Sequence, residues 1–98
     1  MREVELIEKL RRFEATEDAR ERNALAIELS DTHDPRVFEP LVKLIERPDL
    51  VNSRGTLIYS LASYDCSSVA DLLRNLVATG NFEVRSEAQI ILDRQALD

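Results

Sequence analysis

Residues 22–29 read RNALAIEL, residues 54–61 read RGTLIYSL and residues 85–92 read RSEAQIIL. Each segment places an arginine ahead of apolar residues at the third, fifth and seventh following positions. The second segment starts thirty-two residues after the first, and the third starts thirty-one residues after the second. Self-similarity at this spacing is typical of helical repeat proteins, whose units bury their apolar faces by stacking on one another. We therefore expect a rigid helical platform that offers a binding surface rather than a catalytic pocket.

The composition indicates a single all-α domain covering residues 1–98. Apolar residues make up 44% of the chain, and two glycines with three prolines leave little room for a turn-rich β architecture. Ninety-eight residues are near the lower limit for a stacked array, which needs roughly three repeats.

The charge and the cysteine content narrow the classes of partner. Nineteen acidic against thirteen basic residues give a net charge of −6, which disfavours nucleic acid and favours a basic protein partner. Cys66 is the only cysteine, so neither an intrachain disulfide nor a cysteine-based zinc site is expected. The first residues lack the apolar stretch of a signal peptide, and no apolar run approaches the ~20 residues of a membrane span. We expect a cytoplasmic protein without membrane contact.

Helical periodicity and capping residues predict six helices joined by short loops, which makes sequential helices antiparallel neighbours. Asp34 and Pro35 start the third helix, Asp49 caps the fourth, and Gly55 within the fourth marks a close approach to a neighbour. The predicted ranges are residues 2–15, 17–30, 35–47, 49–63, 68–78 and 82–96.

The segments ALAIEL at 24–29 and DPRVFEPLVKLI at 34–45 resemble the HEAT-like repeat of phycobilisome lyase subunits. Val84 and Arg85 fit the valine–arginine pair that opens such a unit, whereas the second unit replaces Asp-Pro by Cys66 and Ser67. The resemblance implies a short right-handed α-solenoid of about three antiparallel hairpins used for protein contact, without lyase activity. In size and charge the chain is also similar to small acidic bacterial immunity proteins that neutralise a cognate toxin.

In such a solenoid the second helix of each unit lines the inner face, so its outward positions should form a stripe with the repeat period. We call these positions the inner stripe; they are Ile7, Arg11, Glu14, Glu39, Lys43, Glu46, Asp71, Asn75 and Ala78. The candidate partner-binding residues are Glu39, Lys43, Glu46, Asp71 and Asn75, together with Tyr64 in the second turn. Two alternatives remain: any solvated helix face carries mixed charge, and Tyr64 can instead be a hydrogen-bonded loop anchor.

Other chemistry-bearing residues have structural interpretations. Arg22, Arg54 and Arg85 recur with the repeat and are expected to bind carbonyls or aspartates of the adjoining unit. We expect His33 to lie in a solvated turn and Cys66 to pack at a helix start. Tyr59 aligns with Ile27 and Ile90 and is expected in the core.

No constellation for catalysis, cofactor or metal binding is visible, and the leading hypothesis is a non-enzymatic protein-binding module with an acidic helical surface. The alternative is a structural or assembly subunit, a scaffold or the helper subunit of an enzyme, that acts through apolar terminal helices. Those helices could also pair two copies into a homodimer. The apolar residues predicted for these terminal faces are Leu6, Ile7, Leu10, Ile90, Ile91 and Leu97.

Overall fold

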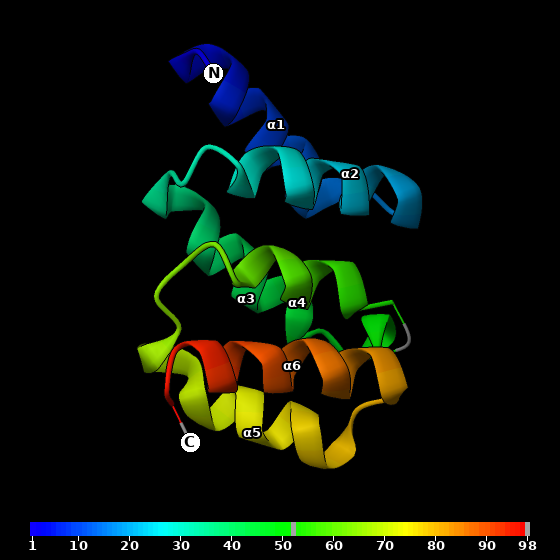
Figure 1. The fold of residues 1–98 in the computed structure, drawn as a ribbon. Coiled ribbons are helices and arrows are strands. Elements are labelled where there is room, and N and C mark those ends of the chain that lie inside the picture. The colour runs from blue at the N-terminus through cyan, green and yellow to red at the C-terminus, as the bar shows by residue number, and fades with distance from the viewer. Residues whose placement is uncertain (52, 98) are drawn as a thin grey trace.

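The computed structural model describes residues 1–51 and 53–97, and within them every regular element is helical. This described part of the chain contains six α-helices joined by short loops, three of which contain a single 3₁₀ turn (Figure 1). The α-helices are α1 (Glu3–Ala15), α2 (Ala19–Ser30), α3 (Phe38–Ile45), α4 (Gly55–Leu61), α5 (Ala70–Thr79) and α6 (Phe82–Arg94). The 3₁₀ turns are Pro35–Val37, Pro48–Leu50 and Ser67–Val69. The predicted all-α class and the six helices are confirmed.

The helices pack as three sequential pairs, α1 with α2, α3 with α4 and α5 with α6. The pairs are joined because α2 packs on α4 and α4 packs on α6, and these three helices run in the same direction (Figure 1). In that view α1 begins above α2 and ends behind it, α3 lies behind α4, and α1 and α3 contact each other. The two ends of the chain lie at opposite ends of the stack. The molecule is compact, with a radius of gyration of 12.8 Å.

The core follows the repeated apolar positions along the whole stack. The central helix α4 has the most complete burial, because Leu57, Ile58 and Leu61 are each 0% exposed. Equivalent positions of the neighbouring helices, Leu29 on α2 and Leu92 on α6, are buried as well. Burying one such side chain contributes roughly 1.5–3 kcal/mol, so the shared core accounts for most of the stabilising free energy.

Capping side chains set the starts of two helices and one turn. Asp18 accepts hydrogen bonds from the backbone N–H groups of Arg20 and Glu21 at the start of α2, and the Asn81 side chain accepts one from Val84 at the start of α6. Asp34 does the same for the 3₁₀ turn before α3, in which Pro35 holds the first position. The predicted roles of Asp34 and Pro35 are confirmed.

The predicted fourth helix was too long. Its first two residues belong to the separate 3₁₀ turn Pro48–Leu50, and α4 begins only at Gly55. The Asp49 carboxylate accepts hydrogen bonds from the Arg47 guanidinium, at 3.0 Å to Nε and 2.6 Å to Nη2, so the predicted helix cap is wrong. Asn52, which the predicted helix included, lies outside the described residues.

Both glycines stand where a neighbouring group comes close. A Cβ atom on Gly55 would lie 1.8 Å from Oε1 of Glu83, which confirms the predicted close approach, here between α4 and α6. A Cβ atom on Gly80 would lie 2.7 Å from the backbone carbonyl oxygen of Leu76 and 2.4 Å from a methyl carbon of Val84. The two positions differ because Glu83 is an exposed flexible side chain, whereas the Leu76 carbonyl is part of α5.

We predict that Gly80→Ala lowers the free energy of unfolding by about 1–3 kcal/mol, as overpacking against a fixed group does. Gly55→Ala should change it by less than about 1 kcal/mol, because Glu83 can turn into solvent and alanine favours a helix. Urea denaturation of the two variants beside the wild type measures both changes. An equal or larger loss for Gly55→Ala would contradict this account of the two contacts.

Candidate functional site

The inner stripe lies on the surface. All nine of its residues are exposed: Ile7, Arg11 and Glu14 on α1, Glu39, Lys43 and Glu46 on α3 and its end, and Asp71, Asn75 and Ala78 on α5. Apolar residues on the other sides of these helices, such as Phe13, Leu41 and Leu73, are fully buried. The repeat period therefore predicted the outward positions of these three helices correctly.

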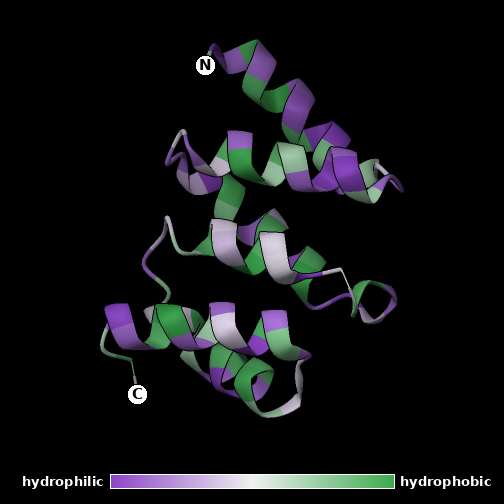
Figure 2. Cartoon of the chain, turned by 45° about the vertical axis from the view of Figure 1, so that its right-hand side comes forward, coloured by the Kyte–Doolittle hydropathy of each residue, from purple (hydrophilic) through white to green (hydrophobic). Residues whose placement is uncertain are grey.

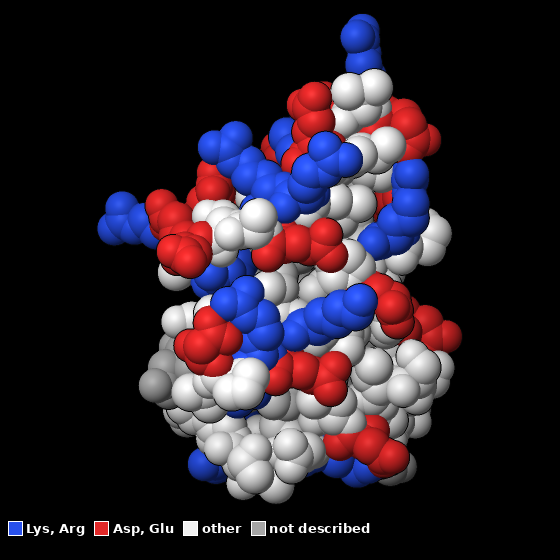
Figure 3. All heavy atoms as spheres, turned by 180° about the vertical axis from the view of Figure 1, so that it is seen from behind, with Lys and Arg blue, Asp and Glu red and all other residues white. Residues whose placement is uncertain are grey.

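The charges of the inner stripe are mixed and unevenly paired. Glu39, Lys43 and Glu46 have no ion pair within the described part of the chain. Asp71 is different, because it forms an ion pair with Arg74, whose guanidinium also donates to the Leu97 carbonyl at 2.9 Å. Seen from behind, the surface shows Lys and Arg interspersed with Asp and Glu over its upper and middle parts, rather than one acidic patch (Figure 3).

Tyr64 takes the role of a loop anchor, which was the alternative to partner contact. Its hydroxyl donates a hydrogen bond to the Asp34 carbonyl at 2.9 Å, and its ring packs edge-on against Phe38 with 5.8 Å between centroids. The side chain is partly buried, and burial is the main cause that raises its pKa to about 12. The residue therefore joins the second turn, which is the loop between α4 and α5, to the first turn, which is the loop between α2 and α3.

Gln95, at the end of α6, makes the same kind of contact one repeat later, to the loop between α4 and α5. Thirty-one residues after Tyr64, its side chain accepts a hydrogen bond from the Cys66 N–H at 2.8 Å and donates one to the Tyr64 carbonyl at 2.9 Å. Each of these two side chains thus binds the backbone of the preceding turn, which holds the turns at one edge of the stack together. Sequence analysis missed Gln95, although the thirty-one-residue offset to Tyr64 would have pointed to it.

Cys66 and His33 have the structural roles that were predicted for them. The Cys66 side chain is fully buried, its thiol donates to backbone carbonyls, and desolvation raises its pKa to about 11, so the thiol stays protonated and unreactive. His33 is exposed and adopts a left-handed backbone conformation with φ of 56°, typical of a residue just after a helix end.

Asp34 is tied to its own turn and is not available for metal binding. Hydrogen bonds from the Arg36 guanidinium, at 3.0 and 2.9 Å, lower the pKa of Asp34 to about 2, and Arg36 also pairs with Glu3 on α1. Among the described residues no group of three histidine, cysteine, aspartate or glutamate side chains is placed to hold a metal ion. None of the helices in this part of the chain is long and apolar enough to cross a bilayer.

Two of the three recurring arginines bind carbonyls as predicted. The guanidinium of Arg22 donates to the Thr16 carbonyl at 3.0 Å, and that of Arg54 donates to the Ile45 carbonyl at 3.3 Å. Both carbonyls lie at the end of the preceding helix, where the helix dipole is negative and carbonyl groups lack partners within the helix. Arg85 is exposed and makes no such bond to the described residues, so the predicted third link is wrong.

The prediction that Tyr59 lies in the core is wrong. Tyr59 is 59% exposed, and its repeat equivalents Ile27 and Ile90 are 42% and 39% exposed. All three lie on the outward side of α2, α4 and α6. Their apolar character suggested burial, but the core positions two residues before and after them are already filled, by leucines in α2 and α4 and by Ala88 and Leu92 in α6.

No family model, curated protein or solved structure matches this chain. The function therefore has to be argued from the surfaces of the molecule.

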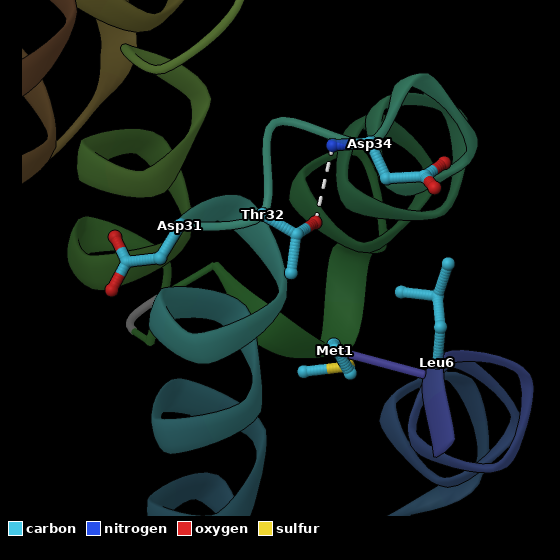
Figure 4. A pocket seen from close by; sticks show the side chains of 5 residues that line it. All are labelled: Met1, Leu6, Asp31, Thr32 and Asp34. Carbon is cyan, nitrogen blue, oxygen red and sulfur yellow. Dashed lines mark hydrogen bonds between the residues drawn. The ribbon is translucent and has the colours of Figure 1, made fainter. Parts of the chain in front are cut away.

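A hollow lies at the N-terminal end of the stack (Figure 4). It measures about 430 Å³ and separates Met1 and Leu6, at the α1 end, from Thr32 and Asp34 in the first turn. Thr32 accepts a hydrogen bond from the Asp34 N–H at 3.1 Å, so the turn is held by its own contacts. Figure 4 shows the Asp31 carboxylate pointing away from Met1 and Leu6. The hollow thus lacks converging polar groups that would recognise a small ligand.

We predict that Tyr64→Phe lowers the free energy of unfolding by about 1 kcal/mol at neutral pH, because the hydrogen bond to Asp34 is lost while the ring contact stays. Since the folded pKa of about 12 exceeds the ordinary value near 10, this tyrosine stabilises the fold fully below pH 10. That stability is lost as the pH rises from 10 through 12, so the gap between wild type and variant should narrow there. Denaturation of both proteins across this pH range measures it, and a constant gap would contradict the assignment.

Proposed function

We propose that the chain is a non-enzymatic protein-binding module of the cytoplasm, built as a short right-handed HEAT-like solenoid of three antiparallel hairpins. Support for the solenoid comes from the three sequential helix pairs and from the succession α2, α4 and α6. Arg22 and Arg54 both bind a carbonyl at the end of the preceding helix, and Tyr64 and Gln95 both bind the preceding loop, which also favours a repeated unit.

The observation that carries this proposal is the exposure of the whole inner stripe on α1, α3 and α5. Nine side chains at repeat-related positions are exposed, on helices whose other sides are held by the core. A rigid helical surface needs little ordering when a partner binds, which favours affinity. Stacked helical repeats use such extended surfaces to contact proteins.

The proposed partner is a basic protein surface. Glu39 and Glu46 are exposed on α3 and its end, and no cation pairs with them within the described residues, so their charge is available to a partner. Asp71 contributes less because Arg74 neutralises it locally, while Lys43 and Asn75 add hydrogen-bond donors that fix orientation. Together with a net charge of −6, the carboxylates would steer a basic partner and raise the association rate at low salt.

The most specific version of this proposal is an immunity protein or inhibitor that binds a cognate toxin. Neither the general binding role nor this specific version requires a cofactor or a metal.

A second candidate function is that of an assembly subunit acting through the end of the stack. The observation that favours it is the apolar surface at the start of α1 and just before it, where Met1, Val4 and Ile7 are exposed, with Val4 at 68%. Two of the apolar residues predicted for the terminal faces, Leu6 and Ile91, are buried inside the chain and cannot contribute. This surface is therefore smaller than the sequence suggested.

We predict that changing Glu39 and Glu46 to lysine abolishes capture of a basic partner in a pulldown from the native cytosol at low salt. High salt should weaken the wild-type capture in the same way, because screening reduces the attraction between exposed charges.

The matched control changes Glu17 and Glu87 to lysine, which alters the net charge by the same amount away from the inner stripe. The control variant should keep the partner. If both variants lose the partner equally, only net charge matters and the inner stripe is not the docking surface. A partner lost only when Val4 and Ile7 are changed to lysine would favour the assembly role.

A further inference from the structure

The opposite long face of the stack, formed by α2, α4 and α6, carries a second regular pattern, which we call the outer grid. Ile27, Tyr59 and Ile90 form its middle row at equivalent positions of the three helices, and all three are exposed. One helical turn separates each row from the next. The complete outer grid consists of Asn23, Ile27 and Asp31 from α2 and its end, Thr56, Tyr59 and Ser63 from α4 and its end, and Ser86, Ile90 and Arg94 from α6.

The centre of the outer grid has no charge. Residues 55–64, which include all of α4, read GTLIYSLASY. Figure 2 shows α4 in white and green, whereas α1 and α2 carry much purple. Solvated helix faces are normally charged, while the centres of protein interfaces are depleted in charge and enriched in tyrosine. The outward side of α4 thus has the character of an interface centre.

A hollow of about 310 Å³ opens beside Tyr59 on this face. Ile27 and Asp31 line it from α2 and its end, Tyr59 and Ser60 from α4, and Arg94 from α6. A second identical face placed opposite would fill this hollow, because the Tyr59 side chain of each copy would enter the hollow of the other.

We propose that a second copy of this chain docks on the outer grid, with a two-fold axis that runs parallel to α2, α4 and α6 and passes beside Tyr59. This axis preserves the direction of the helices and lays α2 of one protomer over α6 of its partner. Ile27 then meets the partner's Ile90, and Tyr59 meets the partner's Tyr59. Asp31 meets the partner's Arg94 in the same way.

Charge complementarity selects the second copy as the occupant. The only charged positions of the outer grid are Asp31 and Arg94, which have opposite signs and lie in the same row on the two outer helices. Neither forms an ion pair within the described residues. The proposed axis forms two Asp31–Arg94 contacts between the protomers, one on each side of the axis. An axis across the helices would lay α2 on α2 and leave Asp31 and Arg94 without a partner of opposite charge.

The available area is sufficient. A standard interface buries about 800 Å² on each partner, which is about a seventh of the 5944 Å² surface of this chain. Three helices side by side provide a face of that extent, with an uncharged centre and a charged residue at two of its corners.

The test is sedimentation velocity of the full chain from about 1 µM to about 1 mM, since dimerisation depends on concentration. The wild type should shift from monomer to dimer within this range. Asp31→Arg and Arg94→Asp should each raise the dimer dissociation constant at least tenfold, because each places like charges across the axis.

The decisive experiment mixes the Asp31→Arg and Arg94→Asp variants. In a dimer of one Asp31→Arg chain with one Arg94→Asp chain, both contacts across the axis again join opposite charges. The mixture should therefore dimerise at least tenfold more tightly than either variant alone. A contact confined within one chain cannot produce this recovery.

Val51→Arg, in the segment before α4, is the matched control for Ile27→Arg on α2, because the two side chains are similarly exposed, at 47% and 42%. Ile27→Arg should weaken the dimer at least tenfold and Val51→Arg should leave it unchanged. A wild type that stays monomeric up to about 1 mM, a mixture no tighter than its components, or equal effects of Ile27→Arg and Val51→Arg would each overturn the proposal.

Discussion

The structure depends on the burial of α4 between α2 and α6. This helix has only seven residues, which is too short to be stable alone, and its stability comes from packing its apolar side on both neighbours. Leu57, Ile58 and Leu61 are inaccessible to water for this reason. Removing either neighbour would expose them, so the three helix pairs are expected to form one cooperative unit rather than three independent ones.

Hydrogen bonds between loops and helix ends hold the pairs in register. At one edge, Tyr64 and Gln95 bind the preceding turns, while Arg22 and Arg54 bind the ends of the preceding helices. These contacts do not involve the two long faces of the stack, which stay exposed to solvent. One face presents mixed charges on α1, α3 and α5, and the other presents an uncharged centre on α4, so they suit partners of different chemistry.

Periodicity predicted the helices and the exposure of the inner stripe, because apolar spacing reports directly which side of a helix is buried. It failed at Tyr59, since an apolar residue can face solvent when leucines beside it already fill the core. The start of α4 was missed because Asp49 binds the Arg47 side chain instead of capping a helix. The repeat offset from Tyr64 could have pointed to Gln95, but its bonds to Cys66 and to the Tyr64 carbonyl are defined only in the folded chain.

Native-state amide hydrogen exchange, followed by NMR at low denaturant concentrations, tests the central role of α4 most directly. We expect the inner amides of α2, α4 and α6 to exchange through one common opening whose free energy equals that of global unfolding. If the amides of α6 stay protected in an opening that releases those of α2 and α4, the stack is not one cooperative unit and this account is wrong.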